Sequence, residues 1–211
     1  MRYLIILFLI LPNLSFSQPQ SLETAAKTFN VGFVPQYSIT DGFRFDLDFR
    51  LNDKNQWLVV APQVYINTGS NWDYDINSLT GFGLEAQHRI YIKNTPFPKG
   101  FYLAYGPVFN YFSVKDDGYV YESYLEDGAT YHELNEDEMT TRIYKVGGNL
   151  IVGVQFLVAD FFYIDTYLGT GMRFSFDDKS RGLHDYYNDW WGDIGYSGSL
   201  LVGGVRFGLS F

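Results

Sequence analysis

One stretch in the first third of the chain limits the possible folds most strongly. From Phe43 to Leu51, five large apolar residues alternate with four charged ones, in the order FRFDLDFRL. A helix would spread these charges around its circumference, because its side chains repeat every ~3.6 residues, whereas a strand sends alternate side chains to opposite faces. The stretch is therefore predicted to be a β-strand with one apolar face and one charged face.

The same alternation recurs along most of the chain. Further stretches with a period of two follow one another, separated by turn-forming residues such as Asp41 and Gly42. The predicted strands are Phe29–Ile39, Phe43–Leu51, Trp57–Asn67, Phe82–Lys93, Phe101–Val114, Arg142–Val158, Phe162–Phe176 and Ser197–Phe211. A chain built from strands of this kind is predicted to be all-β.

Strand length and the lengths of the connections indicate how these strands assemble. A tilted strand needs roughly 10 residues to cross a bilayer, and the predicted strands are about that long or longer. The connections after the second, fourth and sixth strands are short, whereas those after the third, fifth and seventh are long. Short periplasmic turns and long outer loops are typical of membrane barrels. The prediction is an eight-stranded antiparallel up-and-down transmembrane β-barrel.

Three prolines fall inside the predicted strands. Pro35, Pro62 and Pro107 each lack the backbone N–H that a sheet ladder needs. A missing ladder bond is costly in hydrocarbon, because no water is present to replace it. We therefore expect β-bulges or irregular backbone at these three positions.

The first residues are predicted to be a processing segment rather than part of the fold. Arg2 precedes the apolar run Tyr3–Leu11, and Ser15 and Ser17 are small residues at the spacing of a cleavage site. We expect a signal peptide over 1–17, a periplasmic lead-in over 18–27 and one barrel domain over 28–211. The chain has no cysteine, which excludes a lipid-modified cysteine and disulfides. Its net charge of −9 argues against a nucleic-acid partner.

The last predicted strand ends on an aromatic residue. Leu209, Phe207 and Val205 share the apolar face of Phe211, while Arg206 lies on the opposite face. Together with the signal peptide and the alternating strands, this ending resembles the small outer-membrane β-barrels of Gram-negative bacteria, of the OmpA transmembrane-domain type. The resemblance implies an outer-membrane location among lipid and lipopolysaccharide, and recognition of Phe211 as an assembly signal by the barrel assembly machinery. It carries over no active-site motif.

The charged faces of the predicted strands are expected to point into the barrel. An eight-stranded barrel is just wide enough for side chains to fill it, so these charges should interlock. The predicted lumen network comprises Arg44, Asp46, Asp48, Arg50, Glu85, Arg89, Lys145, Asp165, Arg173 and Arg206. Arg206 is expected to meet Asp165 on the neighbouring strand. The network is interpreted as a salt-bridged structural lumen, and the alternative is a narrow channel for small solutes whose basic excess favours anions.

The long connections carry the candidates for recognition. Residues 115–141 hold nine acids and one lysine and are predicted to be irregular. In the last loop the candidates are Tyr186, Tyr187, Trp190 and Trp191. Such aromatics suit stacking on a glycan or contact with a protein, or they cover the barrel mouth. The acids suit divalent cations that bridge lipopolysaccharide phosphates, but no calcium-loop spacing is present and no metal site is predicted.

Little in the sequence favours catalysis. His88 is expected on the outward face, and His132 and His184 in outer loops. Ser180, His184 and Asp185 are close in sequence, but a nucleophile and its base must meet in space. We therefore predict no catalytic residue and no cofactor. The leading interpretation is a non-enzymatic outer-membrane barrel, structural or presenting its loops to a partner or ligand. The alternatives are the narrow channel, a lipid-modifying enzyme and a soluble exported ligand-binding β-barrel.

Overall fold

The computed structural model describes residues 27–40, 42–51, 55–67, 76–93, 95, 97–178 and 198–211 of the chain. The predicted signal peptide and all but the last residue of the predicted lead-in lie outside these residues. Among the described residues, no helix is long and apolar enough to cross a bilayer.

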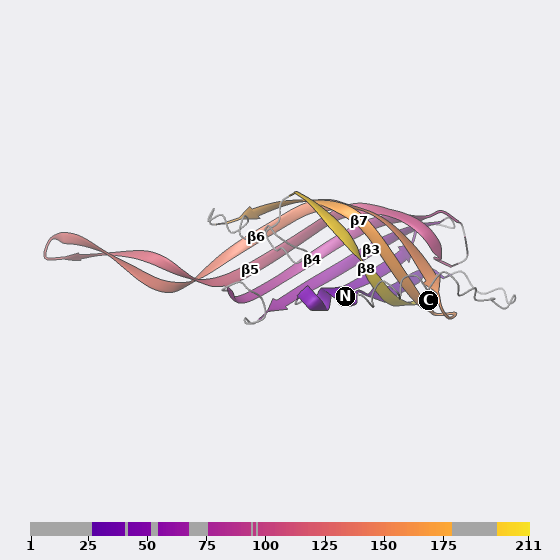
Figure 1. The fold of residues 1–211 in the computed structure, drawn as a ribbon, viewed down its shortest axis with the longest axis horizontal. Coiled ribbons are helices and arrows are strands. Elements are labelled where there is room, and N and C mark those ends of the chain that lie inside the picture. The colour runs from indigo at the N-terminus through magenta and orange to yellow at the C-terminus, as the bar shows by residue number, and fades with distance from the viewer. Residues whose placement is uncertain are drawn as a thin grey trace, which may run out of the picture.

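The described residues form a closed antiparallel barrel of eight strands, in which consecutive strands are neighbours (Figure 1). The strands are β1 (Phe29–Phe33), β2 (Gly42–Arg50), β3 (Gln56–Asn67), β4 (Ile76–Tyr91), β5 (Gly100–Glu126), β6 (Ala129–Leu157), β7 (Phe162–Asp177) and β8 (Gly198–Ser210). Pairing of β1 with β8 closes the ring. This order confirms the predicted all-β, eight-stranded up-and-down barrel.

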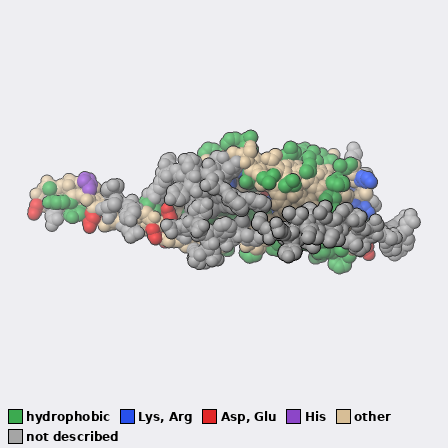
Figure 2. Space-filling view, in the orientation of Figure 1, with side chains coloured by type: hydrophobic (Ala, Val, Ile, Leu, Met, Phe, Trp, Pro, Cys, Tyr) green, Lys and Arg blue, Asp and Glu red, His purple; other side chains and the backbone are tan. Residues whose placement is uncertain are grey.

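The alternation in sequence sorts side chains between the two sides of the barrel wall. In β2, Arg44, Asp46 and Asp48 are buried, while Phe43 and Phe45 are about half exposed on the outside. The space-filling view shows apolar side chains over much of the visible barrel surface (Figure 2). The wall is therefore apolar outside and lined by charges inside, because successive residues of a strand point to opposite faces.

The first strand is shorter than predicted. β1 ends at Phe33, and a 3₁₀ helix, η2 (Pro35–Thr40), replaces the rest of the predicted strand. The cause is Pro35, which cannot donate to a ladder and whose fixed φ suits the first position of a helix. β1 consequently pairs with β8 over four residue pairs, the last of them Phe33 with Phe207. The prediction of a single strand over Phe29–Ile39 is therefore wrong beyond Phe33.

Among the described residues, β1 pairs with β8 only from Phe207 to Ser210. The 3₁₀ helix η2 lies beside the preceding part of β8. Gln36 donates to the Tyr167 hydroxyl at 3.2 Å, and Arg44 donates to the Tyr37 hydroxyl at 3.1 Å. A Cβ at Gly204 would lie 1.6 Å from the Gln36 amide nitrogen, so any side chain there would displace the Gln36 amide. Side-chain contacts of η2 thus take over where the β1–β8 ladder stops.

At Pro62 and Pro107 the expected irregularity is a local gap in one ladder and not a β-bulge. Pro62 stays in register opposite Leu84 of β4, and Pro107 stays in register opposite Gly148 of β6. The ladder that Pro62 would share with β2, and the ladder that Pro107 would share with β4, each lack two residue pairs at the proline. Both ladders then resume in the same register. The missing N–H therefore interrupts one ladder locally without inserting a residue.

The segment 115–141, predicted to be irregular, belongs almost entirely to a two-stranded ribbon. β5 and β6 stay paired to Glu126 and Ala129, well beyond their last pairs with β4 and β7. This ribbon, residues 115–140, projects from one end of the barrel and twists strongly (Figure 1). Its turn is Asp127-Gly128, with φ of 50° and 81°. Both residues in the left-handed region fit a two-residue Asp-Gly hairpin.

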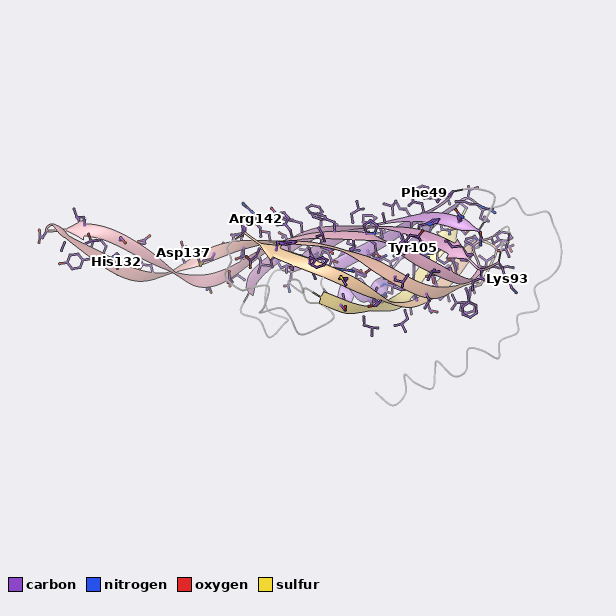
Figure 3. The ribbon with its side chains drawn as sticks, turned by 90° about the horizontal axis from the view of Figure 1, so that it is seen from above. Phe49, Lys93, Tyr105, His132, Asp137 and Arg142 are labelled. Carbon is purple, nitrogen blue, oxygen red and sulfur yellow. The ribbon has the colours of Figure 1, made fainter. Side chains whose placement is uncertain are left out.

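The chain ends at the opposite end of the barrel. The Phe211 amide donates to the Phe29 carbonyl at 2.8 Å, and the Thr28 amide donates to the Phe211 carbonyl at 2.9 Å. The rings of Phe29 and Phe211 stack with centroids 6.3 Å apart. Figure 3 shows Lys93 at this end and His132 far away on the ribbon. The terminal phenylalanine thus forms part of the seam that closes the barrel.

We expect Gly106→Ala to weaken the pairing of β4 with β5. A Cβ at Gly106 would lie 1.8 Å from the Ala86 carbonyl oxygen, a backbone atom that cannot move without disturbing the ladder. The free energy of unfolding in urea, followed by heat-modifiable gel mobility, should fall by about 1–3 kcal/mol. Gly148→Ala is the control, because its Cβ would meet its nearest neighbour at 3.4 Å. Equal losses in both variants would contradict this packing argument.

Candidate functional site

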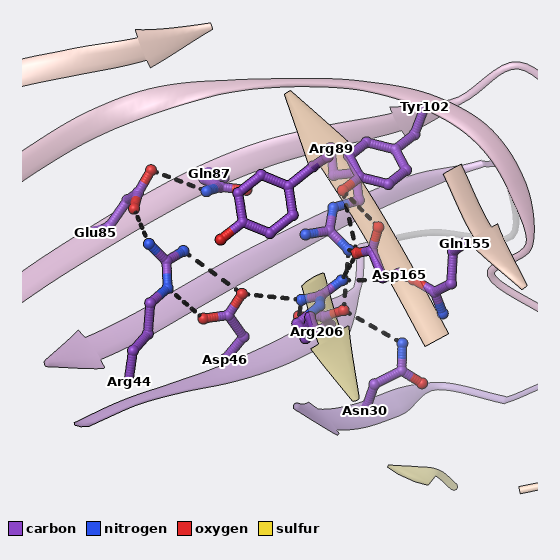
Figure 4. Close-up of polar contacts among 12 residues, drawn as sticks. Asn30, Arg44, Asp46, Glu85, Gln87, Arg89, Tyr102, Gln155, Asp165 and Arg206 are labelled. Atoms are coloured by element: carbon purple, nitrogen blue, oxygen red, sulfur yellow. Dashed lines mark hydrogen bonds and ion pairs between the residues drawn. The ribbon is translucent and has the colours of Figure 1, made fainter. Parts of the chain in front are cut away.

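A buried ionic network lies inside the barrel (Figure 4). It joins three arginines to four carboxylates, namely Arg44, Arg89 and Arg206 with Asp46, Asp48, Glu85 and Asp165. Each of these side chains is at most 3% exposed. The residues come from β2, β4, β7 and β8, so the fold brings together charges that are distant in sequence.

Arg206 makes the largest number of ion pairs in this network. Its Nη1 lies 3.0 Å from an Asp46 carboxylate oxygen and 2.9 Å from an Asp48 oxygen, while its Nη2 contacts Asp165. Asp165 is the residue directly opposite Arg206 in the β7–β8 register. The structure therefore contains the Arg206–Asp165 contact expected from the strand order, and it adds two carboxylates from β2.

The other two arginines share the same acids. Arg44 lies 2.7 Å from Asp46 through Nε and 2.6 Å from Glu85 through Nη1. The Nη1 atom of Arg89 lies 3.2 Å from Asp48 and 3.5 Å from Asp165. Three of the four carboxylates consequently contact two guanidinium groups each.

Neutral side chains complete the network, and the sequence-based list of charged residues missed them. The Tyr102 hydroxyl donates to Asp165 at 2.9 Å, and the Tyr91 hydroxyl donates to Gln155 at 2.7 Å. The Arg89 guanidinium lies 4.3 Å from the centre of the Tyr102 ring. The period of two could have identified these residues, because Tyr102 is in phase with the inward residues of β5.

Pairing and tight packing let these charges stay buried. An ion transferred out of water loses several kcal/mol of effective solvation, which only close partners and additional hydrogen bonds recover. Among the described residues, the space lined by Arg44, Asp46, Gln87, Arg89, Tyr102, Ile151 and Tyr167 has no room for a water molecule. Side chains therefore fill this part of the barrel interior.

The structure buries nine of the ten residues of the predicted lumen network. Lys145 Nζ lies 5.9 Å from the Phe112 ring centre, and Arg173 donates to the carbonyl oxygens of Gly148 and Met172, both at 3.2 Å. Arg50 is the exception, because it is half-buried at the last position of β2. Arg50 is in phase with the inward Arg44, Asp46 and Asp48 of β2, and its place in the network stays a prediction.

Two apolar clusters also point inward. One comprises Trp57, Tyr91, Tyr102, Ala104 and Ile151, and the other comprises Leu79, Phe112, Val114 and Ile143. The second cluster lies where β4, β5 and β6 approach the ribbon, as their pairing shows. Polar and apolar side chains together fill the lumen, as expected for a barrel of this size.

Two of the histidines contact hydroxyl groups. Ser123 Oγ and His132 Nδ1 lie 2.8 Å apart on the exposed ribbon. Among the described contacts, no carboxylate hydrogen-bonds to the His132 ring, although a base of this kind needs a third group to orient it. On the outward face, His88 Nδ1 lies 2.9 Å from the Tyr105 hydroxyl. His88 therefore faces outward, as expected.

The remaining predicted candidates lie outside the described residues. They are Ser180, His184 and Asp185, and the loop aromatics Tyr186, Tyr187, Trp190 and Trp191. In the part of the chain that the structure describes, no group of three or more His, Asp or Glu side chains is arranged to hold a metal ion. The described candidates are therefore the lumen network and the ribbon.

Comparison with known proteins gives only distant structural similarity. No family model and no curated protein matches the chain. Acinetobacter baumannii CarO is 12% identical, with a TM-score of 0.42 over 91% of this chain and 100% of that chain. A. baumannii CarO2 is 13% identical, with a TM-score of 0.38 over 88% and 98%. The N-terminal β-barrel domain of Pseudomonas aeruginosa OprF is 9% identical, with a TM-score of 0.38 over 89% and 100%.

We expect Arg206→Leu to destabilise the barrel strongly. The change leaves Asp46, Asp48 and Asp165 with one fewer cation each, and removing one partner of a buried ion pair lowers stability by about 3–5 kcal/mol. Urea unfolding measures the loss. Arg50→Leu, at the half-buried end of β2, should change stability by less than about 1 kcal/mol. Full stability of Arg206→Leu would show that the network does not hold the barrel together.

Proposed function

We propose that this protein is a non-enzymatic outer-membrane β-barrel with a sealed lumen, whose ribbon presents a binding surface outside the membrane. The outward apolar belt carries this proposal. Phe43, Leu84, Leu150 and Phe174 are 52%, 48%, 51% and 53% exposed, and similar residues recur from β2 to β8. Soluble monomers rarely expose apolar patches larger than a few hundred Å². A bilayer would cover this belt, which disfavours a soluble ligand-binding barrel.

The shape of the molecule supports one orientation in that membrane. The connections from β4 to β5 and from β6 to β7 lie at the end of the barrel that holds Phe211, whereas the ribbon projects from the other end (Figures 1 and 3). In outer-membrane barrels the short turns face the periplasm. The ribbon would then stand on the outer side, above the lipopolysaccharide. Phe211 would be the residue that the assembly machinery recognises.

The lumen network favours a structural interior over a channel. Conduction requires a continuous path through the barrel, with sites that ions enter and leave. The guanidinium groups of Arg44, Arg89 and Arg206 are instead held between carboxylates across the interior. Opening a path would break several buried ion pairs at once. We infer a closed barrel that serves as a rigid anchor.

A binding role also fits the ribbon better than lipid modification does. The Ser123–His132 pair is exposed and lies on a two-stranded ribbon rather than in a pocket. Binding pockets and active sites are concave and remove their ligand from water. We propose no catalytic residue and no cofactor, and we propose that partners contact the ribbon directly.

Planar-bilayer recordings test the sealed lumen. The wild-type protein, inserted in its folded form, should give no reproducible single-channel steps at high salt, because buried ion pairs block the interior. A heat-modifiable gel shift on the same preparation confirms that the barrel is folded. Regular steps from the folded wild-type protein would favour the narrow channel and contradict the proposal.

A further inference from the structure

One face of the ribbon combines opposed carboxylates with stacked rings. Glu122 lies directly opposite Glu133, and the next pair on the same face is Tyr124 with Tyr131. The two tyrosine rings are 5.6 Å apart at an interplanar angle of 19°, and each side chain is nearly half exposed. Asp137 follows on this face toward the barrel, opposite Gly118. We call these residues the acidic face of the ribbon.

The charge of this region is strongly one-sided. From residue 116 to residue 139 the sequence contains nine acids and no Lys or Arg. The nearest cation along β5, Lys115, is already paired with Glu138 on the other face, at 2.6 Å. Figure 2 shows acidic side chains along the ribbon and Lys and Arg side chains at the opposite end of the molecule. A partner that docks here must be positively charged.

The acidic face also works against the stability of the free ribbon. Like charges directly opposite each other destabilise a strand pair, and a two-stranded sheet is marginally stable in water. Glu122 accepts a hydrogen bond from Asn135 at 3.0 Å, but among the described residues no Lys or Arg forms an ion pair with Glu122 or Glu133. A bound cation would remove the repulsion.

We propose that the acidic face binds a polypeptide segment that carries several Lys or Arg side chains. One cationic head would lie between Glu122 and Glu133, with its apolar stem against the Tyr124 and Tyr131 rings. A second would reach Asp137, which is four residues from Glu133 and hence about 13 Å along the strand. This inference rests on the proposed function, because the ribbon must stand outside the membrane to be reached.

The spacing and sign of the charges select this partner over two others. A single divalent cation contacts oxygens within about 2.6 Å, so one ion between Glu122 and Glu133 does not reach Asp137, about 13 Å along the strand. A second copy of this chain would bring an equally acidic ribbon, and like charges brought together oppose association. A row of basic side chains on one extended segment matches both the spacing and the sign.

The test uses the full chain in lipid nanodiscs and a synthetic peptide that alternates Lys with Thr. Glu122→Gln and Glu133→Gln should each weaken peptide binding about threefold at low salt. The same substitutions should increase amide protection of the free ribbon, because they remove the repulsion between Glu122 and Glu133. Weaker binding combined with a more stable ribbon is a result that a purely structural role would not give.

Glu138→Gln is the matched control. It removes the same charge from the same ribbon, but on the face that carries Lys115. Binding should change less than about 1.5-fold. Equal losses from Glu138→Gln and Glu122→Gln would overturn the proposed face. Calcium binding without peptide binding, or unchanged peptide binding in every variant, would overturn the proposed partner. If the heat-shift gel shows a folded barrel, a negative binding result contradicts this inference and leaves the proposed membrane-anchored barrel intact.

Discussion

The contacts of Arg206 with the carboxylates of β2 are the interaction on which the closed barrel depends. β8 and β2 are both neighbours of β1, which pairs with β8 over only four residue pairs. Arg206 of β8 reaches past β1 to Asp46 and Asp48. A short ladder is thus reinforced by a buried ionic contact between the strands on either side of it. The contact with Asp165 ties β7 into the same group.

This interior determines where the molecule can act. Among the described residues, ion pairs and aromatic rings line the lumen, and the outer wall is apolar. Among the described residues, the ribbon extends away from this filled barrel, because β5 and β6 stay paired with each other beyond their last pairs with β4 and β7. The rigid barrel and the marginally stable ribbon are therefore suited to anchoring and to binding, respectively.

The sequence predicted those features that depend on the period of two. The inward charges of β2, the outward phenylalanines and the Arg206–Asp165 contact all follow from alternation and strand order. The contacts of Arg206 with β2 could not be predicted, because they depend on how far the closed barrel staggers its strands. The ribbon was predictable from Asp127-Gly128 and was missed because its many acids resemble a solvated loop. Pro35 ended β1, whereas Pro62 and Pro107 were tolerated in register.

Fluorescence quenching at single cysteines tests the central claim most directly. The chain has no cysteine, so Leu84→Cys on the outward belt and Leu125→Cys at the ribbon tip can each carry one label. In lipid vesicles, a quencher attached to the lipid chains should quench the label at position 84, and aqueous iodide should quench the label at position 125. Quenching of the label at position 84 by iodide but not by lipid would place the belt in water and contradict a membrane-anchored barrel.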